Sequence, residues 1–202
     1  GSGHKGSLYK AKGTEVPCIM RWPAGMKAGV RSEELIQNTD FVPTWFELAG
    51  VKKPAAYRMD GVSLAPLLKA PHQPVREYVY AEIGAARSIK TKTHSYIALR
   101  YTREQVAGVQ EQHRRHLKAM TGLSGGVSRS IATHPHAYTG DQLYDLKRDP
   151  DAQNNLATQR RHAKTLNELK QKLTTELKRF PNRPYGEFVP GGNALAGGGY
   201  EE

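Results

Sequence analysis

Apolar residues along the chain fall into short runs, and the first of these runs lies in residues 14–23. Five apolar side chains come close together there, namely Val16, Cys18, Ile19, Met20 and Trp22. Such a run predicts a short buried strand that ends at Pro23. Cys18 has no cysteine or acidic partner at ligand spacing, so a buried structural thiol is favoured over a nucleophile.

Two short helices are predicted after this strand. The second half of residues 33–50 carries apolar side chains at spacings of four and three, which is typical of one face of a helix. Thr39 or Asp40 can cap the start of this helix, and Gly50 can end it. A second helix is predicted at residues 63–69. The apolar face of the first helix is made by Phe41, Trp45, Leu48 and Ala49.

From residue 75 onward, apolar and polar residues alternate as they do in strands. We expect one antiparallel sheet, with strands near residues 77–83, 87–92, 94–101 and 142–146. Residues 103–120 carry a helical spacing, and residues 121–140 are predicted to form a loop because they are rich in Gly, Ser, Thr, His and Pro.

The clearest helical pattern lies at residues 158–180. One face carries a leucine stripe, and lysine and arginine fill the other face. This stripe predicts a helix that packs on the sheet, because a coiled coil needs more repeats than are present. The stripe consists of Leu166, Leu169, Leu173 and Leu177, extended by Phe180.

The order of these elements predicts an α/β chain. Residues 1–72 are interpreted as the end of an α/β domain, and residues 73–180 as a small α+β subdomain whose antiparallel sheet packs on the C-terminal helix. Residues 181–202 hold many Gly and Pro residues and are predicted to be an extended tail.

Composition narrows the classes of function. The chain has 202 residues and a net charge of +11, from 30 Lys and Arg against 19 Asp and Glu. This charge fits either an anionic partner or a solvated basic surface. No run of 18 apolar residues occurs, so no membrane span is predicted. The single cysteine excludes an intrachain disulfide and a cysteine-based zinc site.

Few residues suggest chemistry by themselves. Lys5 lies beside Gly6, and this pair suits an anion, although a surface lysine is the simpler interpretation. Two histidine pairs could bind a metal, but neither has a third ligand at a fixed spacing, so solvated polar side chains are favoured and no metal site is predicted. Asp149 and Asp151 flank Pro150 and are expected to form a turn. The histidine pairs are His113 with His116 and His134 with His136.

Four segments in order resemble the C-terminal part of the sulfatase family, whose fold is similar to that of alkaline phosphatase. The first contains Lys-Gly-x-x-Tyr and then Val-Pro-x-x-x-x-Trp-Pro. The second reads Asp-x-x-Pro-Thr-x-x-x-Leu-Ala-Gly, and the third reads Gly-x-Ser-Leu-x-Pro-Leu-Leu. The fourth reads Leu-Tyr-Asp-Leu-x-x-Asp-Pro-x-x-x-x-Asn-Leu. These motifs lie in residues 5–23, 40–51, 60–68 and 143–157.

The resemblance implies a sulfuric ester hydrolase that cleaves sulfate esters or sulfamates. In that family the nucleophile is a formylglycine made from Cys or Ser in Cys/Ser-x-Pro-x-Arg, and a calcium ion polarises the sulfate. This chain has neither the nucleophile motif nor an evident metal cluster. The catalytic core is therefore expected upstream of Gly1, and the chain alone is expected to be inactive.

The resemblance assigns one family functional residue clearly. Lys5 matches the lysine that holds a sulfate oxygen, which makes it a catalytic and substrate-binding residue, and His4 beside it is a candidate substrate contact. This chain departs from the family at Glu15, where arginine is usual.

The expected partners are a sulfated small molecule or sulfated glycan, and the N-terminal part of the same protein. The family also implies a periplasmic, secreted or lysosomal location. The alternative is a non-catalytic basic domain that binds anionic polymers. Nucleic acid is a weaker partner, because the chain lacks the interleaved basic and aromatic residues of an RNA-binding sheet.

Overall fold

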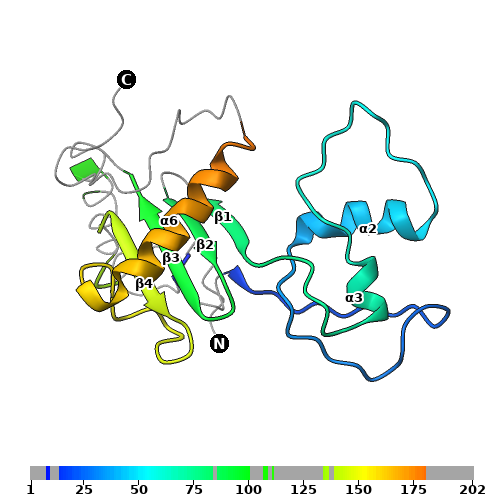
Figure 1. The fold of residues 1–202 in the computed structure, drawn as a ribbon, viewed down its shortest axis with the longest axis horizontal. Coiled ribbons are helices and arrows are strands. Elements are labelled where there is room, and N and C mark those ends of the chain that lie inside the picture. The colour runs from blue at the N-terminus through cyan, green and yellow to red at the C-terminus, as the bar shows by residue number, and fades with distance from the viewer. Residues whose placement is uncertain are drawn as a thin grey trace. The chain divides into compact units, whose positions relative to one another are not determined.

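The computed structural model describes two compact units of the chain (Figure 1). One unit is Pro17–Val79, and the other combines the described residues of Gly1–Val16 and Tyr80–Glu202. The predicted domain boundary after residue 72 stays a prediction. The predicted helix at 103–120 lies almost entirely outside the described residues, as do most of the loop at 121–140 and all of the tail at 181–202. The described residues are 8–9, 14–83, 86–100, 107–108, 111, 134–136 and 139–180.

The two predicted helices of the first unit are confirmed. A 3-10 turn, η1 (Asn38–Asp40), leads into α2 (Phe41–Leu48), whose N-cap residue is Asp40. Gly50 has a φ of 66°, the left-handed conformation that commonly ends a helix. The second helix, α3 (Ala65–Lys69), has Pro66 in its first turn, where a missing N–H group costs nothing.

The predicted buried strand at residues 14–23 is wrong. The segment is not a strand, the exposed fraction of Ile19 is 95%, and Cys18 is exposed rather than buried. A strand needs a neighbouring strand for its backbone hydrogen bonds. Among the described residues, the sheet contains no strand from this segment. Val16, Cys18 and Ile19 therefore face solvent, while Met20 and Trp22 are half-buried.

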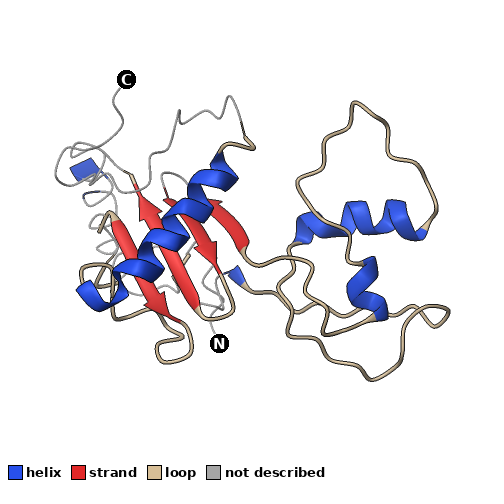
Figure 2. Cartoon of the chain, viewed as in Figure 1, coloured by secondary structure: helices blue, strands red, loops and turns tan. Residues whose placement is uncertain are grey.

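The predicted four-stranded sheet is confirmed (Figure 2). Its strands follow one another in sequence order, and β2–β3 and β3–β4 pair antiparallel, so the sheet is a meander. In the register of these two pairings, Ile97 lies opposite Ser88 on one side and Gln142 on the other. The strands are β1 (Val79–Ile83), β2 (Ala86–Lys90), β3 (His94–Leu99) and β4 (Asp141–Asp145).

The predicted terminal helix is also confirmed, as η2 (Arg160–His162) followed by α6 (Ala163–Leu177). Figure 1 shows α6 running across one face of the sheet, where it contacts β2 and β3. Three leucines of the stripe, Leu166, Leu169 and Leu173, are buried. The apolar stripe therefore covers the sheet, as its spacing predicts.

Candidate functional site

The two residues that the resemblance assigns to sulfate binding, Lys5 and His4, lie outside the described residues. The tyrosine of the same motif, Tyr9, is described, and only 8% of its surface is exposed. Its surroundings therefore show how the end of this motif is held in the fold.

Tyr9 packs into a cluster that joins three distant parts of the sequence. Its ring stacks on the imidazole of His134, with ring centroids 3.8 Å apart and an interplanar angle of 12°. The side-chain amide of Gln142 donates to the Tyr9 hydroxyl at 3.4 Å, and it accepts from the Tyr144 hydroxyl at 2.7 Å. We call this set, together with Ala152, the Tyr9 cluster. Ala152 belongs to the same buried core as Tyr9 and Tyr144.

His134 is a buried structural histidine. Its Nδ1 accepts the backbone N–H of His136 at 3.1 Å, and its Nε2 lies 2.7 Å from the Ala152 carbonyl oxygen. Because an N–H only donates and a carbonyl only accepts, the ring proton is on Nε2 and the imidazole is neutral. The prediction of a solvated side chain is therefore wrong for His134, since the fold gives both ring nitrogens a backbone partner.

The remaining histidines and acids form no metal site in the described part of the chain. His136 is half-buried, and its Nε2 accepts the backbone N–H of Asn155 at 3.4 Å. His113 and His116 lie outside the described residues. Among the residues that are described, no three His, Cys, Asp or Glu side chains come close enough to share an ion. The described residues therefore offer no ligand set for a calcium ion.

The fourth family motif, residues 143–157, forms turns that side-chain hydrogen bonds stabilise. Asp149 accepts the backbone N–H groups of Gln153 and Asn154 at 3.0 and 2.7 Å, which confirms the predicted turn. Ala152 has a φ of 56°, a left-handed conformation that costs about 1–3 kcal/mol for a residue other than glycine. This turn brings the Ala152 carbonyl against His134.

Asp145, at the end of β4, also stabilises a turn. Its Oδ1 accepts the backbone N–H groups of Lys147 and Arg148 at 3.0 and 3.3 Å. Burial acts to raise the pKa of Asp145, but the two backbone hydrogen bonds outweigh it and lower the pKa. The Tyr-Asp-Leu motif therefore contributes a core residue, Tyr144, and a turn residue, Asp145. Burial also raises the pKa of the Tyr144 phenol, which keeps it protonated.

A second polar group lies between the sheet and α6. Asp141 Oδ1 accepts from the Tyr96 hydroxyl at 2.9 Å and from Arg100 Nη2 at 2.8 Å, while Oδ2 pairs with Lys170 Nζ at 2.6 Å. Burial acts to raise the pKa of Asp141, but the hydrogen bonds from Lys170 and Arg100 outweigh it and lower the pKa. Arg100 and Lys170 already balance the charge of this carboxylate, so Asp141 belongs to a structural ion-pair network.

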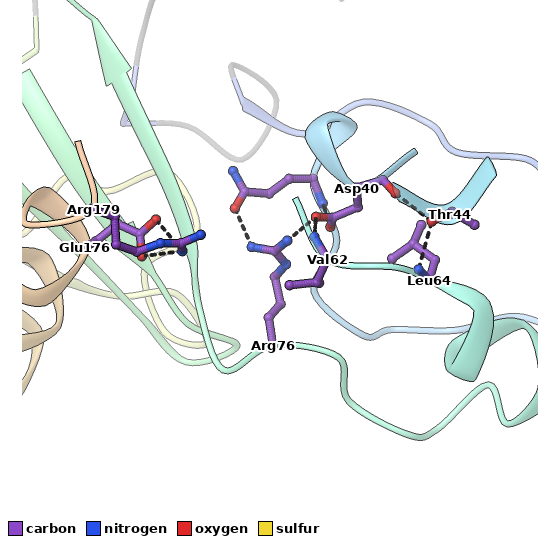
Figure 3. A network of polar contacts seen from close by, with 8 residues as sticks. Asp40, Thr44, Val62, Leu64, Arg76, Glu176 and Arg179 are labelled. Carbon is purple, nitrogen blue, oxygen red and sulfur yellow. Dashed lines mark hydrogen bonds and ion pairs between the residues drawn. The ribbon is translucent and has the colours of Figure 1, made fainter. Parts of the chain in front are cut away.

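The Pro17–Val79 unit contains a buried network around Asp40 (Figure 3). Asp40 is fully buried, and its carboxylate accepts the backbone N–H groups of Gln37 and Val62 at 2.7 and 2.9 Å. Its Oδ1 also pairs with Arg76. The sequence pattern identifies Asp40 only as a cap, whereas the structure shows that it joins three segments of this unit.

Thr44 and Gly61 explain two more positions of the family motifs. The Thr44 hydroxyl donates to the Asp40 carbonyl at 2.5 Å and accepts the backbone N–H of Leu64 at 2.8 Å (Figure 3). A Cβ at Gly61 would lie 2.0 Å from the Thr39 carbonyl oxygen, so only glycine allows this close approach. The second and third motifs therefore maintain the fold of this unit.

A groove of about 530 Å³ lies within the same unit. Its apolar lining includes Cys18, Ile19, Met26, Leu64, Leu67 and Leu68. Lys27, Arg31 and Lys69 also line it, together with one acidic residue, Glu34, so mostly basic side chains lie next to the apolar ones. Ile19, which is part of this lining, is 95% exposed, so no described residue covers the groove at that position.

Comparisons with known proteins agree with the motifs. The family model described as N-sulphoglucosamine sulphohydrolase, C-terminal, matches residues 4–108. The ulvan-active sulfatase of Formosa agariphila is 35% identical over 156 residues, covering 72% of this chain and 29% of that relative. The N-acetylglucosamine-6-O-sulfatase of Bacteroides thetaiotaomicron is 28% identical over 174 residues, covering 82% of this chain and 25% of that relative.

A solved structure shows the same fold. A protein in complex with its substrate D-glucosamine-2-N,6-O-disulfate aligns with a TM-score of 0.53 at 23% identity, covering 80% of this chain and 28% of that protein. The shared fold confirms the predicted α/β class. The match to the ulvan-active sulfatase, together with the family model, places the chain in the sulfatase family. More narrowly, the chain belongs to the N-sulphoglucosamine sulphohydrolase C-terminal family. It spans 25–29% of the length of the two curated relatives.

Proposed function

We propose that the chain forms the C-terminal part of a sulfatase that hydrolyses sulfate esters or sulfamates. The observation that carries this proposal is the family match over residues 4–108, which includes Lys5 and Tyr9 of the first motif. The substrate class is a sulfated small molecule or sulfated glycan. The names of the two relatives support a sulfated sugar, since one is active on ulvan and the other removes a 6-O-sulfate from N-acetylglucosamine.

In this proposal Lys5 binds a sulfate oxygen and His4 contacts the substrate. Negative charge grows on the leaving oxygen and around sulfur as the ester bond breaks. A fixed ammonium group stabilises this charge more strongly in the transition state than in the bound substrate. A lysine, as a compact point charge, is suited to this role.

The formylglycine nucleophile and the calcium ion belong, in this proposal, to the part of the enzyme that precedes this chain. The described residues offer no set of metal ligands. The contribution of this chain is electrostatic and architectural. It supplies the sulfate clamp through Lys5, and the Tyr9 cluster holds the end of the motif that carries it.

The groove of the Pro17–Val79 unit supports a contact with the N-terminal part of the same protein. The two curated relatives are more than three times as long as their match to this chain, which leaves a large part of each available as the occupant. The groove is apolar, and its three basic side chains outnumber its one acidic side chain, Glu34, which favours an occupant that carries acidic residues around an apolar centre. Ile19 would be buried in this contact.

The family also supports a location in the periplasm, outside the cell or in the lysosome. In the part of the chain that the structure describes, no helix is long and apolar enough to cross a membrane.

The net charge of +11 favours one other function, a non-catalytic domain that binds anionic polymers.

Two assays separate the proposals. The intact enzyme is incubated with a panel of sulfated monosaccharides and glycans, and free sulfate is measured. The 202-residue chain alone is tested in the same assay and for salt-dependent retention on a sulfated polysaccharide. Sulfate release by the intact enzyme and none by the chain alone supports the sulfatase. Retention without release by the intact protein supports the binding domain.

A further inference from the structure

Two histidines and a tyrosine from distant parts of the sequence meet beside β4. Tyr9 and His134 are 8% and 7% exposed, and His136 lies next to them. The Tyr9 and His134 rings are nearly parallel, and the Tyr144 ring meets His134 edge-on, with centroids 6.1 Å apart and an interplanar angle of 89°. His134 therefore lies between two tyrosines.

The orientation of the His134 ring is fixed from several directions. Its Nδ1 is bonded to the His136 amide and its Nε2 to the Ala152 carbonyl. Rotation of the ring would break both hydrogen bonds and the stack on Tyr9. A buried polar ring with both nitrogens paired is rigid, since leaving either nitrogen unpaired in the interior is unfavourable. Ala152 also holds a left-handed conformation, which keeps its carbonyl in place.

We propose that His134 is a positioning residue of the sulfatase. Its fixed ring holds Tyr9, and Tyr9 fixes the end of the motif that begins at Lys5, four residues earlier in the sequence. This inference rests on the proposed function, in which Lys5 binds the sulfate. His134 does not contact the substrate in this proposal. It acts through the position of Tyr9, and a displacement of about 1 Å in a reacting group can lower a rate 100-fold.

The His134 side chain suits this role better than an apolar ring does. A phenylalanine could stack on Tyr9, but it would leave the His136 amide and the Ala152 carbonyl without their partner. His134→Phe therefore keeps the stack on Tyr9 but removes the two hydrogen bonds. His134→Ala removes both.

The test compares three variants of the intact enzyme: His134→Ala, His134→Phe and Leu173→Ala. Leu173 is fully buried on α6 and is not part of the Tyr9 cluster, so its variant lowers stability without touching Tyr9. We expect kcat per folded molecule to fall up to about 100-fold in His134→Ala and less in His134→Phe. KM should change by less than about threefold, because the lost interaction belongs to the transition state. Leu173→Ala should keep the wild-type kcat.

Hydroxyl-radical footprinting of Tyr9 on the same samples supplies a readout that needs no substrate. Tyr9 should be protected in the wild type and in Leu173→Ala, and labelled faster in His134→Ala. Wild-type kcat in folded His134→Ala, equal loss in Leu173→Ala, or unchanged Tyr9 labelling would each overturn the positioning role. An intact wild-type enzyme that releases no sulfate from any substrate would instead overturn the proposed function, and the positioning role with it.

Discussion

Asp40 illustrates how much a single buried carboxylate can hold. It binds two backbone N–H groups and the Arg76 guanidinium, and none of its side chain is exposed. We expect Asp40→Ala to lower the free energy of unfolding of this unit by about 3–5 kcal/mol, because two backbone amides lose their acceptor and the Arg76 guanidinium keeps only its hydrogen bond to Gln37. Urea unfolding measures this loss.

Glu47 is the matched control for Asp40. It lies on α2 and is exposed, so Glu47→Ala should change the free energy of unfolding by less than about 0.5 kcal/mol. A loss in Asp40→Ala no larger than that of the control would show that the network is not what holds this unit together.

At the scale of elements, α6 depends on its leucine stripe. Leu173 is fully buried against the sheet, whereas Thr174 beside it is exposed. We expect Leu173→Ala to cost about 2–5 kcal/mol through lost contacts and the cavity that remains. Thermal unfolding of Leu173→Ala and of the control Thr174→Ala checks this expectation. Equal melting temperatures for the two variants would contradict the packing of α6 on the sheet.

The contact between α6 and the sheet should also depend on pH through Asp141. The pKa of Asp141 is lowered below its ordinary value of 3.8, so the charged form favours the folded state. Its contribution is fully present above pH 4 and is lost as the pH falls through the lowered pKa. The stability difference between wild type and Asp141→Asn should therefore be constant from pH 5 to 7 and shrink below pH 4. Denaturant unfolding at each pH measures it, and a difference that grows in acid would refute this role.

The elements predicted from periodicity are largely those that form, because each carries its own apolar pattern. The sheet, α2 and α6 follow from spacings within single segments. The strand at residues 14–23 could not be judged this way, because a strand also needs a neighbour that this segment does not find among the described residues. The Tyr9 cluster was missed for a related reason. Its partners are 125 or more residues from Tyr9 in sequence, and no local pattern shows that His134 and Gln142 meet there.

At the scale of the whole molecule, the apolar groove should be buried in the intact enzyme. Ile19→Asp should leave the stability of the 202-residue chain unchanged, because Ile19 is almost fully exposed there. In the intact enzyme the same change should lower the melting temperature, since it places a charge in an apolar contact. Val51→Asp is the control, because Val51 is 56% exposed and does not line the groove. No effect of Ile19→Asp in the intact enzyme would argue against this docking surface.

Lys5 is the residue on which the proposed activity depends most directly. Removing one preorganised donor to a developing negative charge costs about 2.7–4 kcal/mol, which is a loss of about 100–1000-fold in kcat. We expect Lys5→Ala in the intact enzyme to show this loss at saturating substrate. The stability of the enzyme should change little, because Lys5 is not one of the residues that make up the Tyr9 cluster. Lys178→Ala, at an exposed lysine just after α6, is the matched control and should keep full activity. Turnover by Lys5→Ala within about threefold of wild type, well short of the loss of one such donor, would mean that Lys5 does not bind the reacting sulfate.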